Sequence, residues 1–303
     1  MEEKFYDKLI HTIDKAEVLI NEPMSKHTTF RIGGCADYYV IPVEEVEIQE
    51  LIALCKREKV PYYVMGNGSN LLVSDQGYRG VIIQIYKNRS HISVEGTRLQ
   101  VQAGALLSQI AKEALNHELT GMEFAAGIPG TLGGAVVMNA GAYGGETKDI
   151  LEKVTALTPE GTVISLNKEE LELGYRTSIV AKKNYIVLEA TIQLTKGNAK
   201  MIQETMDTWK EKRTTKQPLE YPSAGSTFKR PEGYFAGQLI EEAGLRGFQV
   251  GGAQVSQKHC GFVINKDHAT AADVISLMRQ VSEKVKSNSG VILEPEVKKL
   301  GEF

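Results

Sequence analysis

The chain has 303 residues, of which 42% are hydrophobic, 24% charged and 7% aromatic. This composition is typical of a globular protein and excludes disorder, collagen and coiled coil as the main structure. The 35 basic and 38 acidic residues give a net charge of −3, so no overall basic field recruits nucleic acid or an anionic membrane. A chain of this length is expected to fold into two or three packed units.

The cysteines and histidines indicate neither disulfides nor a metal centre. Cys35, Cys55 and Cys260 are far apart and form no CxxC pair, which favours a reducing compartment. The six histidines have no metal-ligand spacing, so we expect no bound metal. The start of the chain lacks the basic and apolar regions of a secretory signal, and no window approaches the roughly 18 apolar residues of a membrane span. We therefore expect a cytoplasmic protein.

The first third of the chain predicts a helical segment followed by a βαβ unit. Apolar residues at helical spacing predict one N-terminal helical segment over residues 1–22. Strands are predicted over 35–41 and 60–65, with a helix over 44–58 between them whose inward side includes Val46. This order is typical of a βαβ crossover.

The middle and the end of the chain predict further mixed structure, with a glycine-rich segment at 121–145 that holds eight glycines and one charge. Alternation and helical spacing predict strands over 81–86, 92–94, 99–102, 153–157, 162–166 and 185–194, and helices over 106–117, 199–213, 234–243 and 269–286. A closing strand over 291–300 places Glu294 and Glu296 on one face.

Two glycine loops are candidates for holding a phosphate group through their backbone N–H groups. The loop at 66–70 follows a predicted strand, but it reads GxGxxL and lacks the third glycine of a Rossmann dinucleotide site. The loop at 127–135 runs directly into apolar residues, as a loop at the start of a buried helix does. No GxxxxGK[ST] occurs, which argues against a P-loop nucleotidase.

Five motifs in the same order resemble those of the UDP-N-acetylenolpyruvoylglucosamine reductase family. They are GNGSNLLVSD at 66–75, GIPGTLGGAVVMNAGAYGGE at 127–146, GYRTS at 174–178, AGSTFKRP at 224–231 and LEPEVK at 293–298. The first two recur in the wider flavoprotein family of vanillyl-alcohol oxidase and p-cresol methylhydroxylase, whereas all five together are specific. Only 50 residues separate Arg176 from Ser226, which resembles the shorter subtype that lacks an extra substrate-covering loop.

The resemblance implies an α+β protein with a two-lobed FAD-binding domain of the vanillyl-alcohol oxidase type and a C-terminal α+β substrate-binding domain. The expected divisions are an N-terminal helical segment over 1–24, the FAD-binding domain over 25–197, with lobes at about 25–100 and 101–197, and the C-terminal domain over 198–303. It also implies non-covalent FAD, NADPH as hydride donor and UDP-N-acetylglucosamine enolpyruvate as substrate. We expect a monomer with no nucleic-acid or membrane partner.

The resemblance also implies roles for three catalytic residues. Arg176 is expected to hold the substrate carboxylate, because a guanidinium matches two oxygens at once. Ser226 is expected to protonate the enolate, with neighbouring Thr227 as the alternative hydroxyl. Glu296 is expected to act as a hydrogen-bonding acid beside the enolate, and strand alternation alone leaves Glu294 as the alternative.

Cofactor and substrate residues follow from the same motifs, except Lys216, which is chosen because residues 181–230 contain ten basic and five acidic residues. The expected FAD-binding residues lie in the two glycine loops and just after the second: Gly66, Asn67, Gly68, Ser69, Asn70, Gly127, Ile128, Pro129, Gly130, Gly133, Gly134, Ala135, Asn139 and Gly141. The expected substrate-binding residues are an aromatic residue beside Arg176 and three cations near Ser226 that suit a diphosphate: Tyr175, Lys216, Lys229 and Arg230.

Two other functions fit parts of the sequence. A flavoprotein oxidase or dehydrogenase of small hydroxy acids or phenols would share the cofactor fold. Such enzymes often tether FAD through a histidine near the first loop, and residues 60–80 contain no histidine. A UDP-sugar binding module without redox function would bind no flavin, and the two intact glycine loops argue against it.

Overall fold

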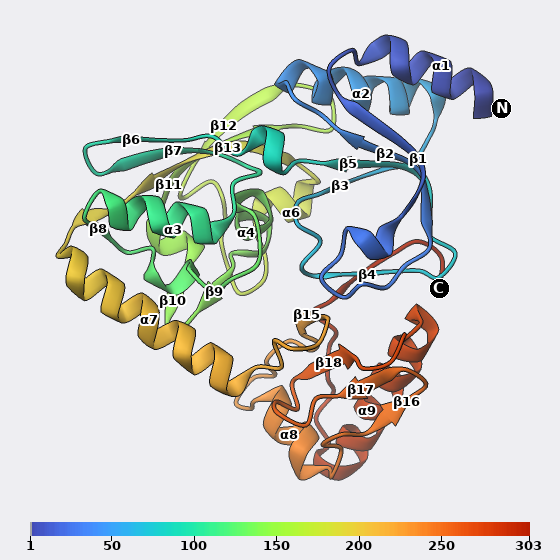
Figure 1. The fold of residues 1–303 in the computed structure, drawn as a ribbon, viewed down its shortest axis with the longest axis vertical. Coiled ribbons are helices and arrows are strands. Elements are labelled where there is room, and N and C mark those ends of the chain that lie inside the picture. Colours follow the sequence, from blue (N-terminus) through green and yellow to red (C-terminus); the bar gives the residue numbers. More distant parts are fainter. Residues whose placement is uncertain (1) are drawn as a thin grey trace. The chain divides into compact units, whose positions relative to one another are not determined.

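The computed structural model describes residues 2–303, which form two compact units (Figure 1). Each unit contains both helices and strands, in agreement with the expected α+β class. The first unit contains the chain up to Leu19, Tyr38–Asn67 and Gly80–Lys212, and the second contains Ile20–Asp37, Gly68–Arg79 and Arg213–Phe303.

A five-stranded antiparallel sheet in the order β12-β11-β13-β7-β6 forms one lobe of the first unit. The strands predicted over 153–157 and 162–166 appear as the hairpin of β11 and β12, and Gly161 with φ 91° lies in the turn between them. The strands are β6 Ile92–Glu95, β7 Arg98–Gln102, β11 Leu151–Leu157, β12 Val163–Asn167 and β13 Ile186–Gln193. The lobe also contains α3 Leu107–Asn116, β8 Leu119–Thr120, α4 Leu132–Met138, β9 Gly141–Ala142, β10 Gly145–Glu146, α5 Thr147–Ile150, α6 Ile179–Lys183 and β14 Thr195–Lys196. Helix α7 Ala199–Lys216 begins in this unit, and its residues from Arg213 onward belong to the second unit.

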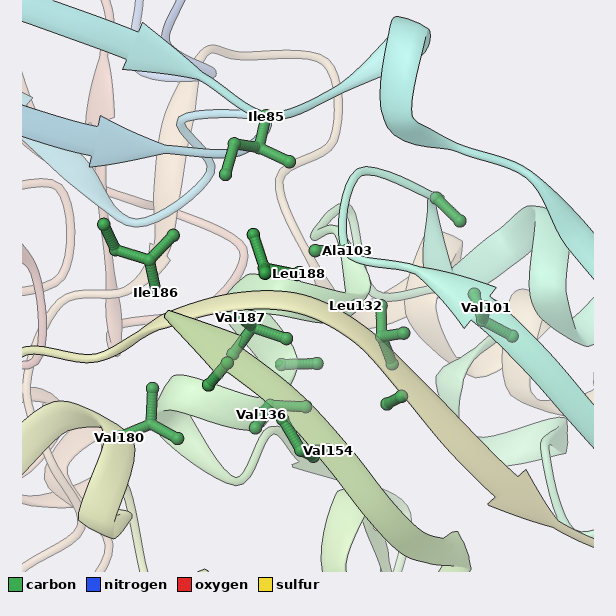
Figure 2. Packing of buried hydrophobic residues seen from close by; sticks show 14 of the residues in the cluster. Ile85, Val101, Ala103, Leu132, Val136, Val154, Val180, Ile186, Val187 and Leu188 are labelled. Carbon is green, nitrogen blue, oxygen red and sulfur yellow. The ribbon is translucent and has the colours of Figure 1, made fainter. Parts of the chain in front are cut away.

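The core of this lobe fixes the position of the second glycine loop. Figure 2 shows Leu132 and Val136 of α4 together with Val187 and Leu188 of β13, and all four side chains are buried. Gly133 approaches Ala103 so closely that an added Cβ would lie 3.2 Å from the Ala103 Cβ. Burial of α4 against the sheet therefore holds the loop that precedes it.

A four-stranded sheet in the order β1-β2-β5-β3 forms the other lobe. The predicted βαβ unit is present as β2 Cys35–Ile41, α2 Glu45–Glu58 and β3 Tyr62–Met65, and β3 pairs in parallel with β5 Tyr78–Gln84. The chain passes between the two units within β2 and β5, and also within β1 Glu17–Pro23.

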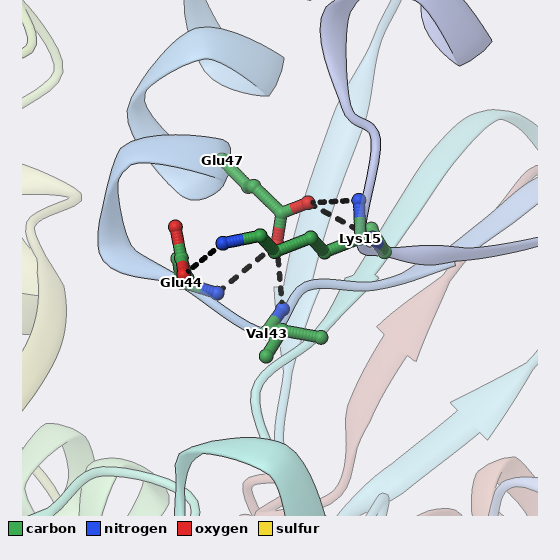
Figure 3. Close-up of polar contacts among 5 residues, drawn as sticks. Lys15, Val43, Glu44 and Glu47 are labelled. Atoms are coloured by element: carbon green, nitrogen blue, oxygen red, sulfur yellow. Dashed lines mark hydrogen bonds and ion pairs between the residues drawn. The ribbon is translucent and has the colours of Figure 1, made fainter.

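The single helix expected over 1–22 is incorrect. Helix α1 spans Glu2–Thr12 and the chain then forms β1. The backbone N–H groups of Lys15 and Ala16 donate to Glu47 Oε1 at 3.0 and 2.9 Å, so they do not continue a helical hydrogen-bond series (Figure 3). The apolar residues after Ala16 therefore belong to a strand.

The inward side of α2 also differs from the expectation at one position. Val46 is 47% exposed, whereas Glu47 is only 2% exposed. The Glu47 carboxylate accepts hydrogen bonds from the backbone N–H groups of Val43 at 2.8 Å and Glu44 at 3.0 Å as well as from those of Lys15 and Ala16 (Figure 3). A buried carboxylate with four donors is compensated for its lost hydration, which is why a charged residue replaces an apolar one here.

The second unit contains a four-stranded sheet in the order β15-β18-β17-β16, with its own hydrophobic core. Its strands pair antiparallel with their neighbours. The elements are β4 Leu71–Val73, β15 Ser223–Ser226, α8 Ala236–Glu242, β16 Gln249–Val250, β17 Ala253–Val255, β18 Phe262–Asn265, α9 Ala271–Ser289 and β19 Lys298–Leu300.

The strand expected over 291–300 is present only at its end, as β19, which pairs in parallel with β4. Pro295 makes one isolated antiparallel bridge with Phe228. Proline has no N–H to donate, so a regular ladder through this segment is not possible. Among the described residues, no helix is both long enough and apolar enough to cross a bilayer.

Candidate active site

The two glycine loops meet in the first unit at Gly66 and Asn67. The Asn67 side-chain amide donates to the Pro129 carbonyl at 2.6 Å. A Cβ on Gly66 would lie 2.2 Å from Thr131 Oγ1, so only glycine allows the first loop to pass this close to the start of α4. Gly127, at the start of the second loop, is exposed, which leaves its backbone accessible to a ligand.

The Arg176 turn also lies in the first unit. Gly174 and Thr177 exchange backbone hydrogen bonds of 3.1 and 3.3 Å, and Arg176 between them has a φ of 56°. The guanidinium carbon lies 5.3 Å from the centroid of the Tyr175 ring, and Tyr175 is 50% exposed. The Gly174 carbonyl accepts from Asn139 at 3.1 Å, which joins the turn to the segment after the second loop.

Ser226 lies in the second unit, at the end of β15. It is exposed and pairs in register with Phe262 of β18. Thr227 is 1% exposed, its backbone N–H donates to Gly261, and its Oγ1 accepts from the Val263 backbone at 2.9 Å. Of the two neighbouring hydroxyls, only that of Ser226 is exposed to a ligand.

Glu296 lies beside this strand. Its backbone N–H donates to the Thr227 carbonyl at 2.8 Å, and its own carbonyl accepts from the Asn70 side chain at 3.2 Å. Glu296 is 9% exposed, whereas the Glu294 side chain is 70% exposed and forms an ion pair with Lys229 at 3.0 Å. The two acids therefore do not share a face, and Glu296 is the buried one.

A cavity of about 410 Å³ opens next to Ser226 within the second unit. Its lining combines three cations with a histidine and the Glu241 carboxylate, which pairs with Arg246 at 2.6 Å. Arg230 is stacked over the Phe235 ring at 4.1 Å. Residues that line it include Ser226, Arg230, Arg246, Lys258, His259 and Cys260. Such a positively charged hollow suits an anionic ligand.

His259 is held in one orientation at this cavity. Its Nδ1 accepts a hydrogen bond from the Gly261 backbone N–H at 3.0 Å, and its ring meets that of Phe262 edge-on. Burial lowers the pKa of His259, and the charges of Arg246 and Lys216 act in the same direction, whereas a backbone hydrogen bond and the charge of Glu241 oppose them. Because Nδ1 accepts a hydrogen bond, the neutral form of the ring carries its proton on Nε2.

Each unit thus gathers a different part of the predicted site. The first unit brings together Gly66, Asn67, the 127–135 loop, Asn139 and the Arg176 turn. The second unit brings together Asn70, Ser226, Arg230 and Glu296. Lys216 belongs there as well, since its charge acts on His259.

Arg246, Lys258 and His259 were missed by sequence reasoning. The pairing of β15 with β18 brings Lys258 and His259, which precede β18, to Ser226, and Arg246 reaches the cavity from the segment after α8; no motif in the sequence indicates these positions. Within the described residues, no group of three or more metal-binding side chains is present.

The loops fit a flavin dinucleotide by their chemistry. They are uncharged, their backbones approach each other at glycines, and the position of Gly66 excludes a side chain. Backbone N–H groups in such loops bind a diphosphate without a lysine.

Two family profiles match the chain. The FAD binding domain matches residues 36–167, and the UDP-N-acetylenolpyruvoylglucosamine reductase C-terminal domain matches residues 217–300. A UDP-N-acetylenolpyruvoylglucosamine reductase of Caldanaerobacter subterraneus is 51% identical over 302 residues, which is 100% of both chains. That of Clostridioides difficile is 50% identical over 98% of each chain.

Solved structures give the same assignment. The crystal structure of UDP-N-acetylenolpyruvylglucosamine reductase (MurB) from Thermus caldophilus superposes with a TM-score of 0.81 at 34% identity, covering 95% of this chain and 99% of that one. A BBE-like protein of Physcomitrella patens has a TM-score of 0.50 at 15% identity, covering 63% of this chain and 44% of that one, which shows the fold alone.

The fold and the loops define a flavoprotein oxidoreductase, with an FAD-binding domain of the vanillyl-alcohol oxidase and p-cresol methylhydroxylase type and a second α+β domain. Within this class, the match to the C-terminal domain profile and the 51% identity to a curated relative over the whole chain identify the family. The chain belongs to the UDP-N-acetylenolpyruvoylglucosamine reductase (MurB) family.

Proposed function

We propose that the chain reduces UDP-N-acetylglucosamine enolpyruvate to UDP-N-acetylmuramate with FAD and NADPH, in peptidoglycan precursor synthesis. Relatives of this name are about half identical over the whole chain, which supports the assignment. The observation that carries the catalytic part is the hydrogen bond from the Glu296 N–H to the Thr227 carbonyl, because it holds Glu296 beside the strand that presents Ser226.

The reaction adds one hydride and one proton across a carbon–carbon double bond. FAD held by the two glycine loops would supply the redox chemistry, which is the transfer of a hydride equivalent from NADPH to the terminal carbon of the alkene. The electron pair of the double bond then moves toward the substrate carboxylate, so the second carbon becomes part of an enolate that must be stabilised and protonated.

Arg176 holds the substrate carboxylate in this scheme. Its guanidinium stays charged at any physiological pH and can donate two parallel hydrogen bonds to the carboxylate oxygens, which gain charge as the enolate forms. The exposed Tyr175 ring beside it offers a surface to the sugar.

Ser226 donates the proton to the enolate carbon, and Glu296 donates a hydrogen bond that stabilises the enolate. A serine hydroxyl is a weak acid, so the proton must be resupplied after each turnover. The exposed position of Ser226 at the cavity supports its role, since ligand and solvent both reach it.

The remaining site residues divide by chemistry. The glycine loops at 66–70 and 127–135, with Gly141, hold the cofactor through backbone groups. Three cations bind the diphosphate of the substrate: Lys216, Lys229 and Arg230. The Lys229 ammonium forms an ion pair with Glu294 at 3.0 Å. Lys229 can therefore bind the substrate only if this ion pair breaks.

Residues 25–197 form the FAD-binding domain and 198–303 the substrate-binding domain in this proposal. The enzyme works as a cytoplasmic monomer on small molecules, without nucleic-acid or membrane partners. Three free cysteines and a net charge of −3 support this part of the proposal.

An anaerobic absorbance experiment tests the function. Purified protein is expected to carry flavin, to lose the flavin absorbance on addition of NADPH, and to regain it when the enolpyruvyl UDP-sugar is added. Return of colour with simple keto acids or quinones but not with the UDP-sugar would favour the alternative oxidoreductase. A colourless protein that takes up no FAD would contradict both.

A further inference from the structure

The Arg176 turn is short and conformationally strained. Arg176 has a φ of 56°, a left-handed conformation that is unfavourable for a non-glycine residue. Such a conformation persists only where the surroundings determine it. The contacts that hold the turn therefore decide where the guanidinium lies.

Asn139 is the hub of these contacts. Its side chain is buried, with only 1% of the residue exposed. Nδ2 donates to Glu146 Oε2 at 2.9 Å and to the Gly174 carbonyl at 3.1 Å, while Oδ1 accepts from the Lys148 N–H at 2.9 Å. Both amide hydrogens are used within the protein, so the side chain has no donor left for a cofactor.

Glu146 adds a negative charge to the contacts of Asn139. Its Oε2 lies 2.7 Å from the Lys148 ammonium. The hydrogen bond from Lys148 lowers the pKa of Glu146, burial opposes this, and the Asn139 amide and the positive charge of Arg176 lower it further. The Glu146 carboxylate at the end of β10 is therefore joined through Asn139 to the Arg176 turn and lies near enough to Arg176 for its positive charge to lower the pKa of the carboxyl.

This hairpin is itself held in place. Its two turn residues, Tyr143 and Gly144, have φ values of 52° and 90°. The Tyr143 ring stacks on Trp209 of α7 with centroids 4.5 Å apart and planes 6° apart. The stack compensates for placing a tyrosine in a left-handed turn position, and it keeps Glu146 in reach of Asn139.

We propose that Asn139 and Glu146 are positioning residues for Arg176: the amide fixes the turn through the Gly174 carbonyl, and the carboxylate orients the guanidinium toward the substrate carboxylate. The proposal rests on the proposed function of Arg176. It assigns the donors of the Asn139 side chain to this turn, while the expected role of Asn139 in FAD binding stays a prediction, and it predicts that the pair affects substrate reduction but not flavin reduction.

The test measures the two half-reactions of the flavin-loaded enzyme by anaerobic stopped-flow absorbance. In Glu146→Gln and Asn139→Asp, flavin reoxidation by the enolpyruvyl UDP-sugar should slow by about 10- to 100-fold, as expected for a misplaced catalytic group. Flavin reduction by NADPH should stay within about twofold. The matched control is Glu172→Gln, because Glu172 lies four residues before Arg176 but pairs with Lys182 at 2.6 Å; it should leave both half-reactions unchanged.

A double-mutant cycle separates positioning from a general structural role. In an Arg176→Lys background, Glu146→Gln should add less than about twofold, because its effect acts through Arg176. A full, multiplicative effect in that background would overturn the proposal, and so would normal reoxidation in Glu146→Gln. If Arg176→Lys itself reoxidises at the normal rate, the proposed role of Arg176 fails together with the inference. If Asn139→Asp fails to retain flavin, the rate of flavin reoxidation in Glu146→Gln alone decides whether the proposal holds.

Discussion

Glu296 and Thr227 are joined by a backbone hydrogen bond of 2.8 Å, from the Glu296 N–H to the Thr227 carbonyl. This bond lies one residue from Ser226 in sequence and draws the C-terminal segment alongside β15. It brings the proposed proton donor and the proposed acid into the same part of the second unit, although 70 positions separate them in the chain.

The two acids of the C-terminal segment should behave differently on substitution. Glu296→Gln keeps the size of the side chain but removes its acidity, so flavin reoxidation by substrate should slow by about 100-fold or more. Glu294→Gln is the matched control, because its carboxylate is exposed and pairs only with Lys229 among the contacts described. Stopped-flow reoxidation rates compare them, and equal losses in both variants would contradict the assignment.

Ser226→Ala should separate the two halves of the reaction. Removing the hydroxyl leaves NADPH oxidation intact, whereas substrate reduction should fall by about 10²- to 10⁴-fold, the range for loss of a general acid. Single-turnover measurement of each half-reaction checks this. Near-normal substrate reduction in Ser226→Ala would show that the proton comes from elsewhere.

Thr227→Val should lower the stability of the protein rather than slow proton transfer to the substrate. The Thr227 hydroxyl is buried and accepts from the Val263 N–H, so valine leaves that donor unpaired. The free energy of unfolding should fall by about 1–3 kcal/mol. Urea unfolding measures this loss, and a proton-transfer defect without loss of stability would argue that Thr227 is the donor instead.

Gly66→Ala should weaken FAD binding. The new Cβ would lie 2.2 Å from Thr131 Oγ1, which must move and separate the two glycine loops. Retained flavin per protein should fall, with an increase in the FAD dissociation constant of at least about tenfold, or 1.4 kcal/mol. Gly96→Ala is the control: its φ of 63° disfavours alanine, but no atom lies within 4 Å of the added Cβ, so it strains the backbone without touching the loops. It should cost stability and leave FAD binding unchanged.

Local patterns predicted most elements because they depend on neighbours in sequence. The βαβ unit, the hairpin at Gly161 and the helix after the second glycine loop all follow from hydrophobic spacing and turn residues. The failures have long-range causes. Two of the four N–H donors to the buried Glu47 come from the distant segment at Lys15, and the 291–300 segment is irregular where Pro295 faces Phe228.

The site was predictable only in part for the same reason. Arg176, Ser226 and Glu296 lie in motifs whose resemblance is read directly from the sequence. His259 reaches the cavity through the pairing of β15 with β18 and Arg246 from the segment after α8, and no local pattern indicates these positions. The choice between Glu294 and Glu296 likewise needed burial, because alternation along an assumed strand treats them as equal.

Glu47 should make stability depend on pH. Burial raises the pKa of Glu47, but hydrogen bonds from the backbone N–H groups of Glu44, Val43, Lys15 and Ala16 outweigh it, and the pKa lies below its ordinary value. A depressed folded-state pKa means that the stabilisation is present above the unfolded value of about 4.3 and is lost as pH falls through the folded value.

Glu47→Gln tests this directly. An amide NH₂ cannot accept the two N–H groups that one carboxylate oxygen accepts, so unfolding free energy at pH 7 should fall by about 2–4 kcal/mol. Protonation of Glu47 weakens the same hydrogen bonds in the wild-type protein. The difference in unfolding free energy between the wild type and Glu47→Gln should therefore narrow as the pH is lowered from about 5 to about 3. Urea unfolding across this range measures the difference, with Glu50→Gln on the exposed side of α2 as control. A difference that stays constant with pH would show that the hydrogen-bonding shape of the side chain, rather than its charge, provides the stabilisation.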